Sequence, residues 1–136
     1  MKFRDRDHEN FFYHLFDISG APNDGYHRGL FYMLSLLDDM RRNIKDLYNA
    51  EDDTIIHEGL NKPWQTGGSS LATMLAFNLY NGYSGREGDE YLYTPYNLLN
   101  SSLMEYGLEA CRLRFRYMPV FEPSVTYEEE SEELEW

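Results

Sequence analysis

The sequence predicts a mainly α-helical protein, a compact bundle of about four to five helices with long loops and room for a small β-hairpin. Three observations lead to this fold class. Apolar side chains recur at intervals of three and four along several segments, and residues that favour helix ends stand at the borders of those segments. No alternation of apolar and polar residues runs long enough to demand a sheet.

The first helix is expected to begin after Asp5 or Asp7, because either carboxylate can cap the first turn. Its apolar residues stand at helical spacing: Phe11, Phe12, Leu15 and Phe16. Gly20 and Pro22 follow, and this combination is typical of a helix end.

A long second helix is expected from Asn23 or Asp24 to about Asn49, since either residue can cap it. Its apolar stripe consists of Leu30, Leu34, Leu37, Ile44 and Tyr48. Arg41 is a polar break in this stripe.

Residues 51–68 indicate a long loop, because they hold several acidic residues, three glycines and a proline. Loops of this length often carry function. Short apolar runs around Ile55 and Tyr91 are the places where a small hairpin can form.

The third helix is expected to start at Ser69 or Ser70 and to run through Asn81, with Gly82 as its stop. Its apolar stripe is Leu71, Leu75 and Leu79. Residues 84–90 then indicate a surface turn.

Two further helix starts are visible downstream. Thr94 followed by Pro95 suits the first positions of a helix. Ser102 with Glu105 has the spacing of a capping box, so the last helix is expected over residues 102–117.

The 136 residues fit one domain, expected over residues 1–121, followed by an acidic and flexible tail over residues 122–136. The single cysteine, Cys111, cannot form an intramolecular disulfide, and the first ten residues carry charges where a signal peptide would be apolar. No apolar run approaches the ~20 residues that span a bilayer. We therefore expect a cytoplasmic protein without a membrane partner.

The formal net charge is −12, and residues 122–136 hold seven glutamates with no lysine or arginine. Direct nucleic-acid binding is disfavoured, because phosphate contacts depend on lysine and arginine. A basic protein partner is the better expectation. For the tail, a solvated terminus is favoured over an interaction arm in which Tyr127, Leu134 and Trp136 would act as anchors.

The run NKPWQTGGSSLATMLAFNLYNGY, residues 61–83, places polar side chains beside much aromatic surface. These polar and aromatic candidates are Trp64, Gln65, Thr66, Asn78 and Asn81. The favoured interpretation is structural, because buried amides generally satisfy other buried polar groups. The alternative is an amide-lined pocket for a small polar ligand.

No catalytic constellation is recognisable. Hydroxyl and thiol side chains are present, but no motif places a histidine or carboxylate to activate one of them. The glycines of QTGGSS lack the lysine of a phosphate-binding loop. The sequence therefore favours binding over turnover.

Five segments of the chain carry a resemblance to a known family. In chain order they are RDRDHENFFY, YHRGLFYML, NKPWQTGGSS, LAFNLYNGY and YTPYNLL. Together they resemble a small uncharacterised family of bacterial proteins, a domain of unknown function carried on mobile elements of Gram-positive bacteria. The resemblance spans roughly residues 1–117 and includes the segments YHRGLFY, WQTGGS and LAFNLYNGY. The WQT and LAFN-x-x-NG elements are its most specific parts. It implies no known activity, but plasmids, phages and conjugative elements are a setting in which anti-defence proteins, including anti-CRISPR proteins, are expected.

A zinc site is the strongest chemical alternative, because histidines, Cys111 and many carboxylates are suitable ligand types. His8 and His27 are the candidate zinc ligands, since the resemblance places both in recurrent segments and the first two helices can pack together. Asp5 or Asp7 would complete the set, which would make the protein a zinc protein or a metal-dependent hydrolase. The favoured interpretation is instead that His27 donates a hydrogen bond within the core and Arg28 pairs with an acidic neighbour.

The function expected from charge and resemblance is inhibition by protein binding. An acidic domain can compete for the positively charged channel of a nucleic-acid-handling protein, most plausibly a CRISPR effector nuclease. The contact residues expected for this partner are Asp38, Asp39, Asp52, Asp53, Tyr127, Glu128, Glu129, Glu130 and Trp136.

Overall fold

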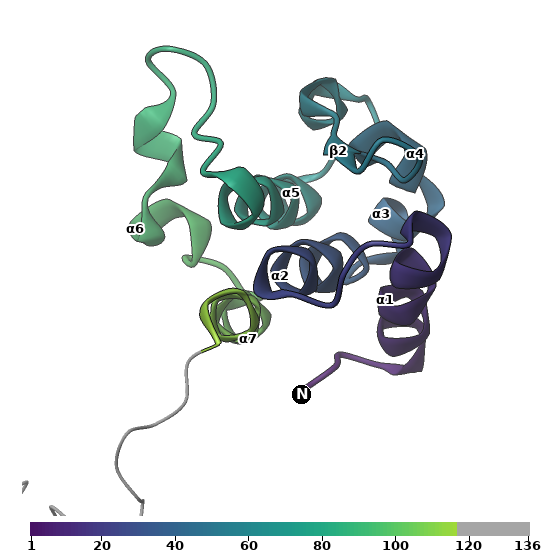
Figure 1. The fold of residues 1–136 in the computed structure, drawn as a ribbon. Coiled ribbons are helices and arrows are strands. Elements are labelled where there is room, and N and C mark those ends of the chain that lie inside the picture. The colour runs from purple at the N-terminus through teal and green to yellow at the C-terminus, as the bar shows by residue number, and fades with distance from the viewer. Residues whose placement is uncertain (117–136) are drawn as a thin grey trace, which may run out of the picture.

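The structure, a computed structural model, describes residues 1–116. Over that range it is mainly helical with one small antiparallel hairpin, so the predicted fold class is confirmed (Figure 1). In chain order the elements are α1 (Arg6–Ser19), α2 (Gly25–Leu34), α3 (Asp38–Arg42), α4 (Ile44–Leu47), β1 (Tyr48–Asn49), β2 (Thr54–Ile55), η1 (His57–Asn61), α5 (Gly67–Asn81), η2 (Glu90–Tyr93), α6 (Pro95–Leu98) and α7 (Met104–Phe115), where η marks a 3-10 helix. No helix among these residues is both long and apolar enough to cross a membrane.

The predicted tail contacts lie outside the described residues: Tyr127, Glu128, Glu129, Glu130 and Trp136. The predicted boundary between domain and tail at residue 121 also falls there and stays a prediction.

Helix α2 is the centre of the fold, with α1, α5 and α7 packed around it (Figure 1). Every residue from Gly29 to Leu34 is buried, as expected for a helix that is apolar on all sides. Gly25 and Gly29 face α7, and a Cβ atom on Gly25 would overlap the carbonyl oxygen of Arg114. These two glycines therefore let the backbones of α2 and α7 approach closely.

The first two helices start where the sequence predicts, and the first helix also ends there. Asp5 caps α1 by accepting a hydrogen bond from the backbone N–H of His8, and Asp24 caps α2 in the same way through His27. Gly20 ends α1 in the left-handed conformation, with φ of 64°.

The predicted long helix from residue 24 to 49 is wrong, because the chain turns after Leu34 and forms the separate short helices α3 and α4. The Ser35 hydroxyl donates to the carbonyl of Phe31 at 2.6 Å. The guanidinium of Arg41 donates to the carbonyl of Ser35 at 2.8 Å and to that of Leu36 at 3.2 Å. Arg41, the polar break in the stripe, thus satisfies carbonyls that an unbroken helix would use internally.

One strand of the hairpin holds the predicted Ile55, but the prediction of a strand around Tyr91 is wrong, because Tyr91 lies in the 3-10 helix η2. Tyr48 pairs with Ile55 across the β1–β2 ladder. Helix α5 begins at Gly67 and is capped by Thr66 in a capping box with Ser69, so the predicted cap at Ser69 or Ser70 is wrong. Gly82 ends α5 as predicted, with φ of 79°.

The C-terminal elements agree in part with the sequence. Thr94 caps α6 and Pro95 is its first residue, as predicted. Helix α7 begins at Met104, and no side chain caps it, so the predicted capping box at Ser102 is not formed. The Arg114 guanidinium donates from Nε to the carbonyl of Leu79 at 2.6 Å and so ties α7 to α5.

His8 is fully buried between α1 and α2. Its Nδ1 accepts the backbone N–H of Arg4 at 3.0 Å, and its Nε2 lies 2.8 Å from the carbonyl oxygen of Tyr32. A neutral ring with the proton on Nε2 satisfies both contacts, whereas a second proton on Nδ1 would face the N–H of Arg4. Burial lowers the pKa of His8 to about 4, against smaller opposing effects led by the hydrogen bond to Tyr32.

We therefore expect stability to fall as the pH is lowered from about 6.5 to 4. In that window the unfolded chain binds a proton at His8 and the folded chain does not, which lowers the free energy of unfolding by up to about 3 kcal/mol. Urea unfolding at a series of pH values measures this slope. His8→Gln should flatten it and His14→Gln, at an exposed histidine of α1, should not; equal slopes in all three proteins would contradict the assignment.

Candidate functional site

The acidic residues predicted as partner contacts fall into two groups. Asp38 and Asp39 stand in the first turn of α3, and both form ion pairs with Arg42. Asp52 lies exposed in the hairpin turn, where its carboxylate accepts a hydrogen bond from the side chain of Asn49 at 3.1 Å. Of the four, Asp53 alone is held inside a polar network.

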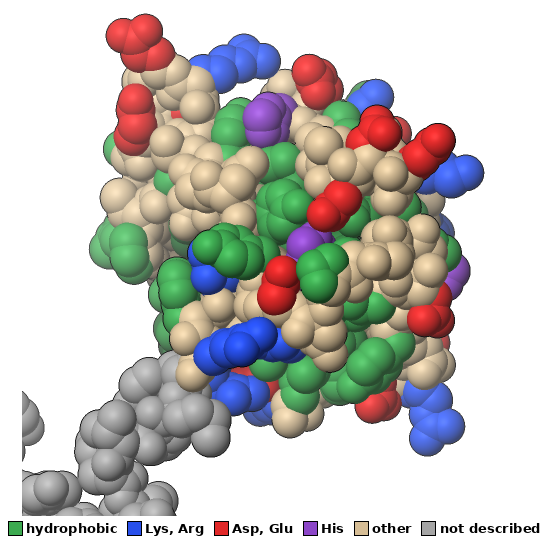
Figure 2. Space-filling view, in the orientation of Figure 1, with side chains coloured by type: hydrophobic (Ala, Val, Ile, Leu, Met, Phe, Trp, Pro, Cys, Tyr) green, Lys and Arg blue, Asp and Glu red, His purple; other side chains and the backbone are tan. Residues whose placement is uncertain are grey.

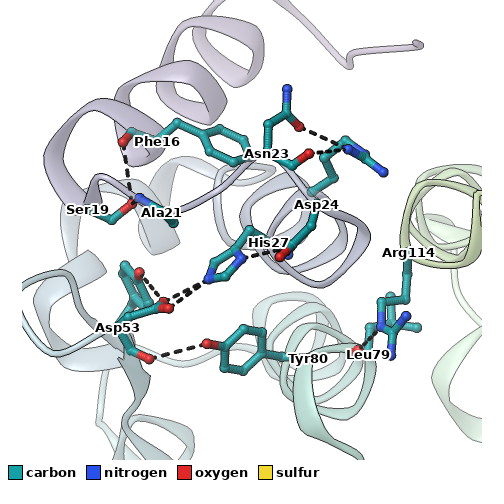
Figure 3. A network of polar contacts seen from close by, with 12 residues as sticks. Phe16, Ser19, Ala21, Asn23, Asp24, His27, Asp53, Leu79, Tyr80 and Arg114 are labelled. Carbon is teal, nitrogen blue, oxygen red and sulfur yellow. Dashed lines mark hydrogen bonds and ion pairs between the residues drawn. The ribbon is translucent and has the colours of Figure 1, made fainter.

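That network surrounds His27, whose imidazole lies between two carboxylates (Figure 3). Its Nδ1 is 2.8 Å from Asp24 Oδ1, and its Nε2 is 2.8 Å from Asp53 Oδ2. The hydroxyl of Tyr48 donates to Asp53 Oδ1 at 2.7 Å, and the hydroxyl of Tyr80 donates to the Asp53 carbonyl oxygen at 3.2 Å. Both ring nitrogens therefore face carboxylate oxygens.

The network joins the start of α2, the hairpin turn and α5. His27 is buried, and Asp53 adopts a left-handed conformation with φ of 53°, which is uncommon for a residue other than glycine. Burial works to raise the pKa of Asp24, but the hydrogen bonds from the backbone and ring of His27 outweigh it and lower that pKa. The predicted hydrogen bond of His27 is thus present. Arg28 donates to the carbonyl and side chain of Asn23, and within residues 1–116 it forms no ion pair with a carboxylate.

The predicted zinc ligands do not come together. His8 uses its ring nitrogens on backbone groups of Arg4 and Tyr32, while His27 lies between Asp24 and Asp53. The Asp5 carboxylate caps α1, and Asp7 is exposed on the same helix. Over residues 1–116 there is no group of three or more His, Cys, Asp or Glu arranged to hold a metal ion.

The WQT segment braces the loop before α5. Gln65 donates from its amide to the Gly59 carbonyl at 3.1 Å and accepts from the Ser69 hydroxyl at 2.6 Å. Trp64 donates from its indole to the Asp46 carboxylate at 2.9 Å. These bonds fix η1 against α4 and α5.

The two asparagines act at the other end of α5. Asn78 donates from its amide to the Tyr83 carbonyl at 3.1 Å, and Asn81 accepts the Tyr83 backbone N–H at 3.1 Å. Together they position Tyr83 directly after the Gly82 stop. The five polar and aromatic candidates therefore lie in two places and form no common pocket, in agreement with their structural interpretation.

The elements that they brace are the walls of a cleft. This η1–α5 cleft has a volume of about 560 Å³ and lies between η1, α5 and the segment that follows α5. Its charged and aromatic lining consists of His57, Glu58, Tyr83, Arg86, Asp89 and Tyr93. A volume of this size falls in the range of ligand-binding pockets.

Aromatic rings from η1 and from the segment after α5 meet in the η1–α5 cleft. His57 and Tyr83 stack with ring centroids 4.0 Å apart at an interplanar angle of 11°. Tyr93 meets Tyr83 edge to face at 5.8 Å. Burial raises the pKa of Tyr93 to about 12, with smaller effects from Tyr83 and Asp89, so its hydroxyl keeps its proton at neutral pH.

The charged groups of the cleft are unpaired within residues 1–116. Glu58, Arg86 and Asp89 take part in none of the ion pairs formed there. Sequence reasoning missed all three, although the interrupted loop at 51–68 and the turn at 84–90 mark the two segments that supply them.

Residues 86–96, which we name the acidic–aromatic segment, continue from the rim of the cleft through η2 into α6. Tyr91 and Tyr96 are 70% and 83% exposed, more than any other large hydrophobic side chain in residues 1–116. Glu87 and Glu90 are exposed beside them in the sequence. Figure 1 shows η2 and α6 standing out from the helices packed around α2.

Comparisons with known proteins give a family and nothing beyond it. The model of DUF6075, described as a family of unknown function, matches residues 1–125. The search of curated proteins gave no match, and neither did the search of solved structures.

Proposed function

The chain belongs to this family of unknown function, and from its own surface we propose that it is an acidic inhibitor that acts by binding a basic protein. The observation that carries the proposal is the acidic–aromatic segment. It places the two most exposed tyrosines of the described chain next to Glu87 and Glu90. Tyrosines anchor protein interfaces, and carboxylates favour a partner of opposite charge.

The overall charge supports the same role. Of the formal −12, residues 1–116 contribute −5 and the seven glutamates beyond them contribute −7. Figure 2 shows acidic side chains scattered around one face, with hydrophobic side chains exposed between them. Such a surface speeds encounter with a positively charged protein and repels nucleic acid.

The predicted acidic contacts contribute unequally to this proposal. Asp38 and Asp39 are offset by Arg42, and Asp53 is engaged with His27 and Tyr48. Asp52 keeps an exposed carboxylate, so it joins the acidic–aromatic segment among the proposed contacts.

We place the partner among nucleic-acid-handling proteins, most plausibly a CRISPR effector nuclease. Such effectors hold guide and target in positively charged channels, which an acidic domain can cover. The resemblance to proteins of mobile elements in Gram-positive bacteria supports an anti-defence role, since those elements are the targets of such nucleases.

Salt-dependent capture tests this function. The full chain, immobilised and exposed to lysate of a CRISPR-proficient Gram-positive bacterium, should retain a nucleic-acid-handling protein at 50 mM salt and release it at 500 mM, because interactions between exposed charges are screened. Mass spectrometry identifies the retained protein. Retention of no such protein at low salt would contradict the proposal, and equal retention by a chain truncated after Phe121 would remove the tail from it.

A further inference from the structure

The η1–α5 cleft combines an aromatic surface with carboxylates in its lining. The aromatic surface is the stacked pair of His57, from η1, and Tyr83, from the segment after α5, extended by Tyr93. Glu58 comes from η1 and Asp89 from the segment after α5, so the two carboxylates stand on different walls.

From this combination we propose that the cleft binds an arginine side chain of the partner protein. A planar guanidinium stacks on aromatic faces and donates hydrogen bonds to carboxylates. The inference rests on the proposed function, because it names the group that a basic partner would insert.

Charge selects a cation over an anion in this cleft. Two carboxylates against the single guanidinium of Arg86 leave the charged lining with an excess of one negative charge, and the whole chain carries −12. A nucleotide or another phosphate ligand would meet this field with its own negative charge. Arg86 is an exposed lining residue, and its positive charge opposes an incoming cation.

The walls are built to hold their geometry. Gln65 holds η1 through a hydrogen bond to the Gly59 carbonyl. Asn78 donates to the backbone carbonyl of Tyr83, and Asn81 accepts the backbone N–H of the same residue. Gly85, with φ of 82°, lets the chain pass close to Asp89 and Tyr93, since a Cβ atom there would lie 2.8 Å from the Cβ of Asp89. A preorganised cleft loses less entropy when a flexible side chain enters it.

The test uses the full chain and three blocked peptides, acetyl-Gly-X-Gly-amide with X as arginine, lysine or citrulline. In ¹H–¹⁵N spectra the arginine peptide should shift the amide signals of Tyr83, Arg86 and Asp89. Of the three peptides, it should saturate these shifts at the lowest peptide concentration. Citrulline has the shape of arginine without its charge, so it should bind about tenfold more weakly. Equal binding of citrulline or lysine would overturn the choice of a guanidinium, and shifts produced by adenosine monophosphate in its place would overturn the choice of a cation.

Removal of negative charge and removal of positive charge from the cleft should change the affinity for the arginine peptide in opposite directions. Glu58→Gln combined with Asp89→Asn should weaken binding of the arginine peptide about tenfold, and Arg86→Ala should strengthen it. Asp17→Asn, at an exposed carboxylate of α1 outside the cleft, is the matched control and should change nothing. Spectra of the free variants show whether each one is folded, and unchanged binding in folded variants would contradict the site.

The two proposals can fail separately. Arginine binding in the cleft without capture of a nucleic-acid-handling protein would overturn the inhibitor role and keep the cleft. Capture of such a protein without arginine binding would leave the inhibitor role standing and contradict the proposal that the cleft binds arginine.

Discussion

Replacement of Gly25 by alanine is expected to lower the free energy of unfolding by about 3 kcal/mol or more, because overpacking against a rigid neighbour cannot relax easily. The new methyl group would overlap the backbone carbonyl of Arg114, and only a shift of α7 away from α2 would make room. A loss of this size is a large part of the total stability of a small domain. Urea unfolding measures it directly.

The matched control is Gly67→Ala. Gly67 is the first residue of α5 as Gly25 is of α2, but a Cβ atom at Gly67 would meet nothing within 4 Å. We expect this variant to keep or slightly raise the stability, since alanine reduces the freedom of the unfolded chain. Equal effects of the two substitutions would contradict the close packing of α2 on α7.

Replacement of both Tyr91 and Tyr96 by serine is expected to weaken retention of the partner about thirtyfold or more. Loss of a buried interface anchor costs about 2 kcal/mol, and each 1.4 kcal/mol is a tenfold change in affinity. Both side chains are largely exposed in the free protein, so its stability should stay within about 0.5 kcal/mol of the original.

Titration of the purified partner against both proteins measures this effect. Tyr13→Ser, which removes a half-exposed tyrosine from α1, is the surface control and should bind as the original does. Unchanged affinity in the folded double variant would remove the acidic–aromatic segment from the proposed interface.

Much of the fold follows from local signals that act within a few residues. Asp5, Asp24 and Thr94 cap helices, and Gly20 and Gly82 end them, each through short-range hydrogen bonds that the sequence makes visible. These features could be predicted because cap chemistry depends little on distant parts of the chain.

The break after Leu34 could not be predicted in the same way. The apolar stripe continues through Leu37 and Ile44, so the periodicity alone favours one long helix. The break depends on Arg41 folding back onto the carbonyls of Ser35 and Leu36, which is a tertiary contact. An arginine within an apolar stripe is the one local feature of the sequence that indicates this break.

The candidate site shows the same division. A structural use of Gln65 and Asn78 follows from amide chemistry, since both bond to backbone carbonyls, whereas Asn81 is exposed and accepts the N–H of Tyr83 directly after its own helix. The cleft itself was missed, because its walls come from two loops that are far apart in the sequence and carry no motif. The pairing of His27 with Asp53 was missed for the same reason, since the two residues meet only when the hairpin folds beside α2.

In the proposed function the protein blocks nucleic-acid binding by its partner. The most direct measurement is fluorescence anisotropy of labelled target DNA on the purified, captured partner, loaded with its guide where it uses one, as increasing amounts of the full chain are added. We expect the anisotropy to fall to the value of free DNA, with a midpoint that moves to higher protein concentration as salt is added. Undiminished DNA binding in the presence of saturating protein would contradict it.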